Sequence, residues 1–367
     1  MDAKIGLLAH NKIASDEAAR LRHMPNATHR PTPNKDSFNS RTLNKNSRAK
    51  LERYQELFFI LQTQPQYFAR LFKVMKERGS VEADQKRMES LVMSTFAHAQ
   101  KQREEYYLLK LLAQSIQEEM NTCNAYPDFA RGTFFFTRLF GVYTRVPRDR
   151  KFIRQTFGQL IKVNIIEDET LNLESDPQFI YRAVLNDEEL RTGRITRDPN
   201  MPKDLAIQQP DVRAIFVDNL QAIRNLVDNF VYAFEESVSR MPYGARYMAK
   251  QMFDCLCARY TQEDSRDLLM TVGFWVWKTY IKPAFVDPEG QGLIDRGLDS
   301  TDKRNLNIFS TVLNQYMTAK PFSTTDLFYF QPLNRHLLDD IALKLEVIWK
   351  QGKSQNHSEH IQANFCQ

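Results

Sequence analysis

The feature of the sequence that most constrains the fold is a long apolar stripe between residues 212 and 239. Its members recur every three or four residues, which places them on one side of a helix: Leu220, Ile223, Val227, Phe230, Val231, Phe234 and Val238. The run Pro242-Tyr243-Gly244 then breaks the pattern. Alternating apolar and polar runs bounded by tight-turn dipeptides, which would indicate strands, are scarce. We therefore predict an all-α fold without a β-sheet.

Shorter segments carry the same helical signal. Apolar residues at helical spacing begin at Ala49, and Gln64-Pro65 ends this helix. A second helix is predicted over 67–74, followed by a charged linker over 79–85. Further helices are predicted over 91–120 (as one helix or two joined), 134–143 and 152–163. Trp275, Trp277 and Tyr280 are interpreted as helix core.

The two ends of the chain differ in composition from the rest. Residues 1–48 are polar, and 25–46 are rich in Asn, Pro, Ser, Thr and Arg. Such segments cannot bury enough apolar surface to fold alone. We expect a partly flexible arm over 1–48, a helical domain over 49–350 and a flexible tail over 351–367.

The overall composition excludes several classes of protein. With 42% hydrophobic and 26% charged residues and a net charge of +5 over 367 residues, the chain is typical of globular proteins and lacks the basic excess of a nucleic-acid binder. No apolar run reaches the roughly 20 residues of a membrane span, and the N-terminus does not resemble a signal peptide. We expect a cytoplasmic protein without membrane insertion, which reaches the cell cortex or plasma membrane only through a partner.

The cysteines and the histidines of the tail do not form a pattern that would hold a metal. Cys255 and Cys257 are two residues apart in a predicted helix, so their side chains face different directions. His357, His360 and Cys366 lie in the polar tail without a fourth ligand. We expect reduced thiols and no metal site.

Several sequence blocks follow one another in an order known from one protein family. They are KIGLLAHNKI at 4–13, LERYQELFFILQTQPQYFARL at 51–71, REEYYLLKLL at 103–112, LNLESDP at 171–177, PYGARYMAK at 242–250, Pro283-Ala284 and Arg304-Asn305-Leu306. Together they resemble the GTPase-activating-protein-related domain of the IQGAP family, within the Ras GTPase-activating (RasGAP) superfamily. The resemblance covers nearly the whole chain.

This resemblance implies a fold and a partner. The fold would be all-helical, with a central catalytic part at about 90–320 and an outer subdomain built from both chain ends. The partner would be a Ras-type small GTPase, or one of the Rho family. The chain has no GxxxxGK[ST] phosphate-binding loop, so GTP and Mg²⁺ would belong to the partner. We therefore expect no cofactor, and an activator of a GTPase rather than an enzyme in its own right.

The resemblance places one arginine at the position of the catalytic finger. Residues 126–136 read YPDFARGTFFF, and alignment on the blocks either side puts Arg131 at the finger position, with Gly132 allowing close approach. An arginine inserted in trans neutralises charge developing on the phosphates and is worth roughly 10³–10⁵-fold in rate in Ras. Pro127 is predicted to stop helix propagation and leave Arg131 on an exposed loop.

Two alternatives to this assignment remain open. A solvated loop arginine without a catalytic role is one reading of Arg131. A shift of register would instead bring Arg138, Arg145 or Arg148 to the finger position. In the common animal IQGAPs a threonine replaces the finger arginine, and those proteins bind Rho-family GTPases without accelerating hydrolysis.

A second RasGAP signature differs in this chain. RasGAPs carry Phe-Leu-Arg shortly before Pro-Ala, and this arginine supports the finger loop. Counting back from Pro283-Ala284 gives Thr279, with Lys278 next to it. A hydroxyl cannot make the forked contacts of a guanidinium, so we expect weaker activity than in a fully equipped RasGAP, or none. The predicted contacts to the GTPase are Arg145, Arg148, Lys282, Pro283, Lys303, Arg304 and Asn305.

Three functional hypotheses follow. The first is a GTPase-activating domain that stimulates hydrolysis through Arg131. The second is an inactive IQGAP-like domain that binds and stabilises a GTP-bound Rho-family GTPase. The third is a helical scaffold with a vestigial GTPase groove.

Overall fold

The computed structural model describes residues 44–354 with gaps at 146, 296 and 324–326. Over this range every regular element is a helix and none is a strand, which confirms the all-α prediction. Most of the predicted N-terminal arm and most of the predicted C-terminal tail lie outside the described residues. The chain divides into two compact units, Met1–Thr122 and Cys123–Gln367. The predicted outer subdomain built from both chain ends stays a prediction.

The described part of the first unit consists of four α-helices and a short 3-10 turn. They are α2 (Lys45–Thr63), α3 (Pro65–Glu77), α4 (Glu82–Thr95), η2 (Ala97–Ala99) and α5 (Gln102–Met120). Pro65 is the first residue of α3, where its missing N–H costs nothing, so the predicted break falls there. The segment predicted as one helix or two is interrupted at Ala97, His98 and Ala99, which all have positive φ.

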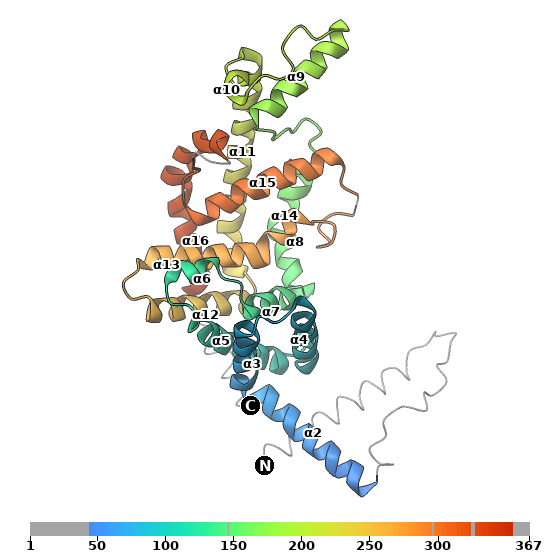
Figure 1. Cartoon of the computed structure of the whole chain (residues 1–367), viewed down its shortest axis with the longest axis vertical. Helices are drawn as coiled ribbons and strands as arrows, with labels where there is room; N and C mark the ends of the chain where they lie inside the picture. The colour runs from blue at the N-terminus through green and yellow to red at the C-terminus, as the bar shows by residue number, and fades with distance from the viewer. Residues whose placement is uncertain (1–43, 146, 296, 324–326, 355–367) are drawn as a thin grey trace, which may run out of the picture. The chain divides into compact units, whose positions relative to one another are not determined.

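The second unit contains the remaining helices (Figure 1). They are α6 (Tyr126–Arg131), α7 (Phe135–Tyr143), α8 (Pro147–Ile161), η3 (Lys162–Ile166), α9 (Pro177–Thr192), α10 (Lys203–Ala206), α11 (Pro210–Ser237), η4 (Val238–Arg240), α12 (Tyr243–Arg259), α13 (Ser265–Val276), η5 (Trp277–Ile281), α14 (Pro283–Val286), α15 (Ser300–Thr318), η6 (Phe328–Leu333), η7 (His336–Ile341) and α16 (Ala342–Ser354). Of the η segments, η3, η5 and η7 are π-helical turns. The apolar stripe lies on α11, except for its last member, Val238, which is in η4.

Aromatic side chains form the centre of the second unit. Phe230 of α11 stacks on Phe157 of α8 with ring centroids 4.8 Å apart, and both contact Phe285. Trp277 is fully buried against the same rings, and its Nε1 donates a hydrogen bond of 2.8 Å to the Asn314 side chain. The indole therefore adds apolar burial without leaving its polar atom unsatisfied.

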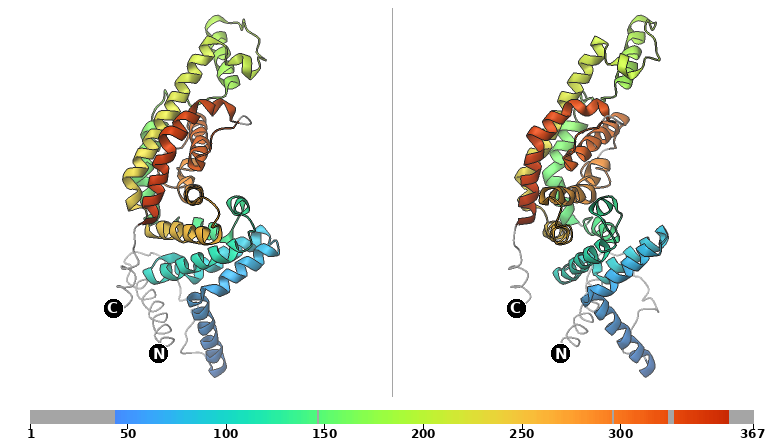
Figure 2. Two further views of the ribbon diagram at one scale, coloured as in Figure 1. Left: turned by 90° about the vertical axis from the view of Figure 1, so that its left-hand side faces the viewer. Right: turned by 60° about the vertical axis from the view of Figure 1, so that its left-hand side comes forward.

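The last helix packs against the centre through a tryptophan. α16 runs beside α11, as two views show (Figures 1 and 2). Its Trp349 lies over Gly273 of α13, where the indole occupies the space that a Cβ would need. Phe234 of α11 packs edge-on against the same indole at 5.1 Å. The glycine therefore allows α13 and α16 to pack closely.

The PYGARYMAK block also has a packing explanation. Gly244, in the first turn of α12, is buried against the ring of Tyr143, which would clash with any Cβ at this position. Tyr143 is itself fully buried. Close packing of α7 against α12 therefore explains the glycine in this sequence block.

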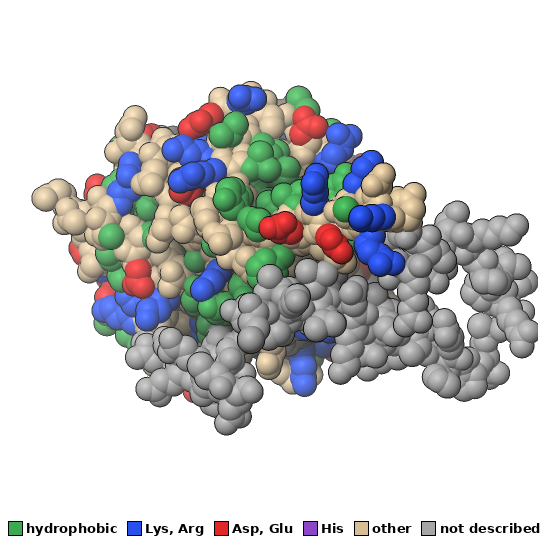
Figure 3. Space-filling model, turned by 90° about the horizontal axis from the view of Figure 1, so that it is seen from below, with side chains coloured by type: hydrophobic (Ala, Val, Ile, Leu, Met, Phe, Trp, Pro, Cys, Tyr) green, Lys and Arg blue, Asp and Glu red, His purple; other side chains and the backbone are tan. Residues whose placement is uncertain are grey.

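Some large apolar side chains remain on the surface. On α2 and α3 these include Tyr54, Phe58 and Tyr67, which are 61%, 46% and 52% exposed. One face of the molecule shows hydrophobic side chains lying among Lys and Arg side chains (Figure 3). No residue of α2 is buried, so this helix contributes less to the described core than α3 or α5.

Candidate functional site

The segment around Arg131 folds differently from the predicted loop. Tyr126–Arg131 form the short helix α6, with Pro127 in its first turn, where proline is compatible with a helix. As predicted, no helix runs through Pro127 from the preceding residues, but the loop expected at Arg131 is the end of a short helix. Arg131 is the last residue of α6, and an extended stretch from Gly132 leads into α7. The side chain of Arg131 lies outside the described part of the chain, so its role as the finger stays a prediction.

Gly132 is fixed by the ring of a neighbouring phenylalanine. A Cβ at this position would lie 2.6 Å from Cζ of Phe134 and 3.1 Å from the Asp128 carbonyl oxygen. The Phe134 ring is buried between Phe129, at 5.0 Å, and Phe136, at 5.4 Å. The residue after Arg131 must therefore be small because an aromatic ring covers it, a packing reason that the sequence alone does not reveal.

The N-terminal end of α6 is bound to α13. The Tyr126 hydroxyl shares a short hydrogen bond with the Thr271 hydroxyl and donates to the Asp267 carbonyl at 3.3 Å. Partial burial is the main reason that the pKa of Tyr126 is raised, so its hydroxyl stays a neutral donor at physiological pH. Tyr126 thereby holds the start of α6 against α13.

The segment that follows Gly132 is bound to the same helix through Trp275. Nε1 of Trp275 donates to the Thr137 hydroxyl at 3.0 Å. Its indole stacks on Phe140 at 4.6 Å and lies 6.2 Å from Phe136. The chain on both sides of Arg131 is therefore attached to α13. Sequence reasoning interpreted Trp275 as core, but it is half-buried and bridges two helices.

Thr279 uses its hydroxyl within its own helix. Its Oγ1 donates to the Trp275 carbonyl oxygen at 2.7 Å, one turn earlier. Lys278, next to it, is exposed. The predicted supporting position thus carries a side chain whose one donor is already used. Attachment to α13 through Tyr126 and Trp275 provides the observed support of this segment instead.

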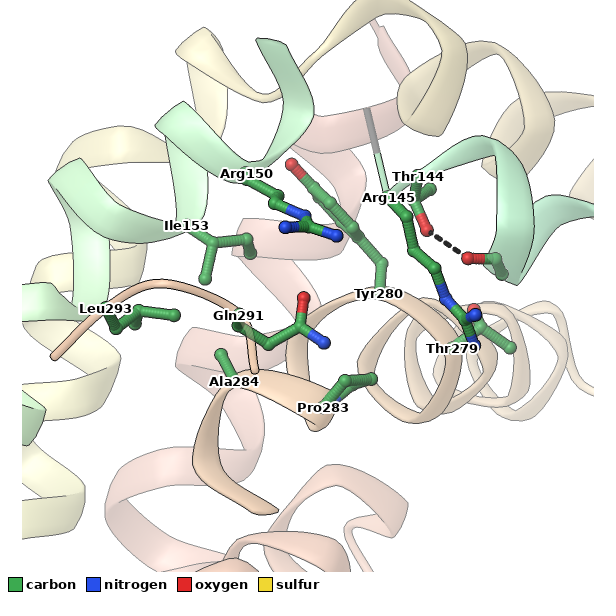
Figure 4. Close-up of a pocket in the computed structure, with 11 residues that line it drawn as sticks. Thr144, Arg145, Arg150, Ile153, Thr279, Tyr280, Pro283, Ala284, Gln291 and Leu293 are labelled. Carbon is green, nitrogen blue, oxygen red and sulfur yellow. Dashed lines mark hydrogen bonds between the residues drawn. The ribbon is translucent and has the colours of Figure 1, made fainter. Parts of the chain in front are cut away.

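A small pocket brings several of the predicted residues together (Figure 4). It has a volume of about 90 Å³ and includes Arg145, Thr279 and Pro283 from the predicted set. The sequence did not single out two of its polar lining residues, Arg150 and Gln291. They come from α8 and from the stretch after α14, and no local sequence pattern relates two positions so far apart.

Lysines increase the positive charge near this pocket. Lys282 is partly buried, and burial, followed by repulsion from Lys278, lowers its pKa. Both causes disfavour its charged form, and a nearby anion would oppose them. An acidic partner surface would therefore suit this region.

The residues predicted on α15 divide into two groups. Lys303 and Arg304 are exposed. Asn305 is only 1% exposed: its Oδ1 accepts from the Leu173 N–H at 3.1 Å, and its Nδ2 donates to the Leu171 carbonyl at 2.9 Å. It was predicted to contact the GTPase, but the structure places it where it holds the 171–173 segment.

Other predicted features can be placed briefly. Arg148 lies in the first turn of α8, and its side chain is outside the described residues. Among the described residues, no three His, Cys, Asp or Glu side chains are grouped in a way that could hold a metal ion. Cys255 and Cys257 are half-buried thiols. No helix in the described ranges is long and apolar enough to cross a membrane.

Comparison with known proteins identifies the class of this fold. The family described as GTPase-activator protein for Ras-like GTPase matches residues 111–318, more than half of the chain. The chain therefore belongs to the RasGAP family.

Several relatives are named Ras GTPase-activating-like proteins. The mouse Ras GTPase-activating-like protein IQGAP2 is 30% identical over 332 residues, which is 88% of this chain and 21% of that protein. Ras GTPase-activating-like protein rgaA of Dictyostelium discoideum is 28% identical over 316 residues, covering 85% and 38%. Ras GTPase-activating-like protein rng2 of Schizosaccharomyces pombe is 27% identical over 351 residues, covering 94% and 23%. The chain thus spans between about a fifth and two fifths of these relatives.

Proposed function

We propose that this chain binds a Ras-type small GTPase and stimulates its GTP hydrolysis with Arg131 as a finger in trans. The observation that supports this most is the fixed position of the α6–α7 segment. Arg131 lies in the chain between Tyr126 and Thr137, and the hydrogen bonds of these two residues attach that segment to α13. Membership of the RasGAP family supports the choice of partner.

The proposed chemistry requires little of the protein beyond position and charge. The Arg131 guanidinium would neutralise charge that develops on the phosphates in the transition state, while GTP and Mg²⁺ come from the partner. Such electrostatic stabilisation is effective only when the donor is held in place before the reaction. Attachment of α6 and α7 to α13 provides this preorganisation for the backbone, even though Thr279 does not.

The proposed partner surface is basic. Arg145, Lys278, Lys303 and Arg304 are exposed and positively charged. A positive surface steers an acidic partner and raises its association rate in a salt-dependent way. We place the GTPase against this surface.

A second function is a non-catalytic domain that holds a GTP-bound Rho-family GTPase. Thr279 favours it, because the hydroxyl bonds to its own helix and offers no forked donor to the finger segment. This function needs the basic surface but not the Arg131 side chain.

Single-turnover GTP hydrolysis by a panel of Ras and Rho proteins separates the two functions. For the first, the chain accelerates hydrolysis, Arg131→Ala abolishes the acceleration, and Arg182→Ala, an exposed arginine on α9, leaves it unchanged. Acceleration that survives Arg131→Ala would exclude Arg131 as the finger. Tight binding that depends on GTP but brings no acceleration would favour the second function. Equal affinity for the GDP and GTP forms would count against both.

A further inference from the structure

We propose that the small pocket lined by Arg145, Arg150 and Gln291 is a receptor for one carboxylate side chain of the partner protein. The assignment of that carboxylate to a GTPase rests on the proposed function. The evidence for the carboxylate pocket itself comes from the geometry of this chain alone.

The strongest observation concerns the guanidinium group of Arg150. Its Nε is buried and has no hydrogen-bond partner. Buried polar side-chain atoms almost always have a partner, so this donor is available to a ligand or to a water molecule. Across the part of the chain that the structure describes, neither Arg150 nor Arg145 forms an ion pair with an acidic residue.

Other polar groups converge on the same space. The Gln291 carboxamide extends toward Arg150, and the Arg145 guanidinium lies beside Thr279 (Figure 4). Tyr280, on the wall, is held in place because its hydroxyl donates to the Asp149 carbonyl at 2.8 Å. Arg150 and Gln291 face the same space and can supply several donors to one acceptor group, and Arg145 adds positive charge at the edge of the pocket.

The acidic residues nearby do not occupy the pocket. Asp287 accepts from the Gly290 N–H at 3.0 Å, and Glu289 accepts from the Leu298 N–H at 2.6 Å, so both carboxylates are used in their own loop. The pocket therefore keeps a net positive charge.

Size and lining select a carboxylate among the anions. A volume of about 90 Å³ accommodates a group of a few atoms and excludes a nucleotide. Ile153, Ala284 and Leu293 make part of the wall apolar, which suits the methylene stem of an Asp or Glu side chain. A guanidinium matches the two oxygens of a carboxylate with a planar fork. A free phosphate would present charged oxygens to the apolar wall instead.

The first arm of the test uses the chain alone. The Nε–H resonances of its arginines are followed by NMR during titration with sodium acetate or sodium phosphate, against sodium chloride at equal ionic strength. We expect a saturable shift of the Arg150 resonance with acetate, with a smaller response to phosphate. The shift should be absent in Arg150→Gln and unchanged in Arg182→Gln. No saturable acetate shift, or a stronger response to phosphate, would overturn the proposal.

The second arm uses the full chain with a GTP-loaded GTPase that it binds. Arg150→Gln should weaken binding roughly 10- to 100-fold and reduce its salt dependence, as expected when a charged hydrogen-bond partner is lost. Arg182→Gln should bind like the parent chain. If the acetate arm succeeds and no GTPase binds, the proposed function fails while the carboxylate pocket stands. If a GTPase binds and Arg150→Gln has no effect, the partner's carboxylate does not use this pocket, and the proposal fails.

Discussion

Trp275 donates a 3.0 Å hydrogen bond from its indole Nε1 to the hydroxyl of Thr137, and this bond joins α13 to α7 six residues after Arg131. The same indole stacks on Phe140 at 4.6 Å. The position of the proposed finger is therefore coupled to the helix that also contains the anchors of Tyr126. Variants of this contact test whether the coupling matters for activity.

Trp275→Phe should lower GTPase stimulation while leaving the affinity for the GTPase largely intact. The phenyl ring keeps much of the stacking but loses the donor, which costs about 1 kcal/mol of stability. A displaced finger segment would reduce single-turnover hydrolysis by roughly 10- to 100-fold. Hydrolysis assays and thermal unfolding measure the two effects. Thr137→Val, which removes the acceptor instead, should act in the same direction. Full activity in both variants would show that this bond does not position Arg131.

Gly132→Ala should destabilise the chain and reduce activity. The added methyl would lie 2.6 Å from the Phe134 ring, so the ring or the backbone must move. Such overpacking costs roughly 1–3 kcal/mol. Gly158→Ala is the matched control, because Gly158 lies inside α8 and a Cβ there would approach only the Arg154 Cγ, at 3.6 Å. The control should gain up to about 1 kcal/mol. Denaturant unfolding compares the two, and equal stability would contradict the packing role of Gly132.

Asn305→Ala should lower stability, whereas changes at its exposed neighbours should not. Removing the amide leaves the buried N–H of Leu173 without its partner, at a cost of about 1–3 kcal/mol, and takes a donor from the half-buried Leu171 carbonyl. Lys303→Ala and Arg304→Ala should keep the unfolding midpoint and weaken GTPase binding in a salt-dependent way. If Asn305→Ala were as stable as the parent chain, the bonds to the 171–173 segment would contribute nothing.

Thr279→Arg should raise GTPase stimulation by roughly 10-fold or more if the finger segment can use a forked donor at this position. The longer side chain would start at the wall of the carboxylate pocket and reduce its volume, so the acetate response of Arg150 should weaken as well. Thr279→Lys adds a charge without the fork and should gain less. A gain that is equal in both variants would point to charge alone.

Glu346→Gln should reduce stability at neutral pH but not in acid. A hydrogen bond from Lys350, opposed by partial burial and assisted by Arg266, lowers the pKa of Glu346. Its contacts are 2.6 Å to Lys350 Nζ and 2.9 Å to Arg266 Nε. A lowered pKa stabilises the fold above the unfolded value of about 4.3. That stabilisation disappears as the pH falls through the folded pKa.

The difference in unfolding free energy between Glu346→Gln and the parent chain should therefore be about 0.2–1 kcal/mol near pH 7, because solvent screens the exposed partners, and vanish well below pH 4. Chemical denaturation across this range measures it. A difference that stays constant with pH would mean that the carboxylate charge is not responsible.

Sequence periodicity predicted the long helices because their apolar faces are one-sided and continuous. The apolar stripe from Leu220 to Val238 is buried as expected. Periodicity does not define the start of the helix at Pro210 or the 3-10 turn that follows it. The break at Gln64-Pro65 was also predictable from proline alone. Local signals of this kind require no knowledge of neighbouring helices.

The parts that the sequence could not predict depend on contacts between distant segments. Pro127 was interpreted as a helix breaker, although a first-turn proline fits a helix. Asn305 has a polar side chain typical of surfaces, and only the arrival of residues 171–173 explains its burial. Arg150 and Gln291 meet because α8 and the stretch after α14 converge, which no spacing along the chain reveals.

The packing of Trp349 on Gly273 has a practical consequence for the design of fragments of this protein. The family match ends at residue 318, but the indole that fills the surface of α13 belongs to α16, beyond that limit. A fragment trimmed to the matched range would begin inside α5 and would uncover Phe234 and Gly273, whose exposed apolar surface favours aggregation. We therefore expect that a stable fragment extends beyond the range that the family model matches, and truncation series should be planned from Trp349 outward.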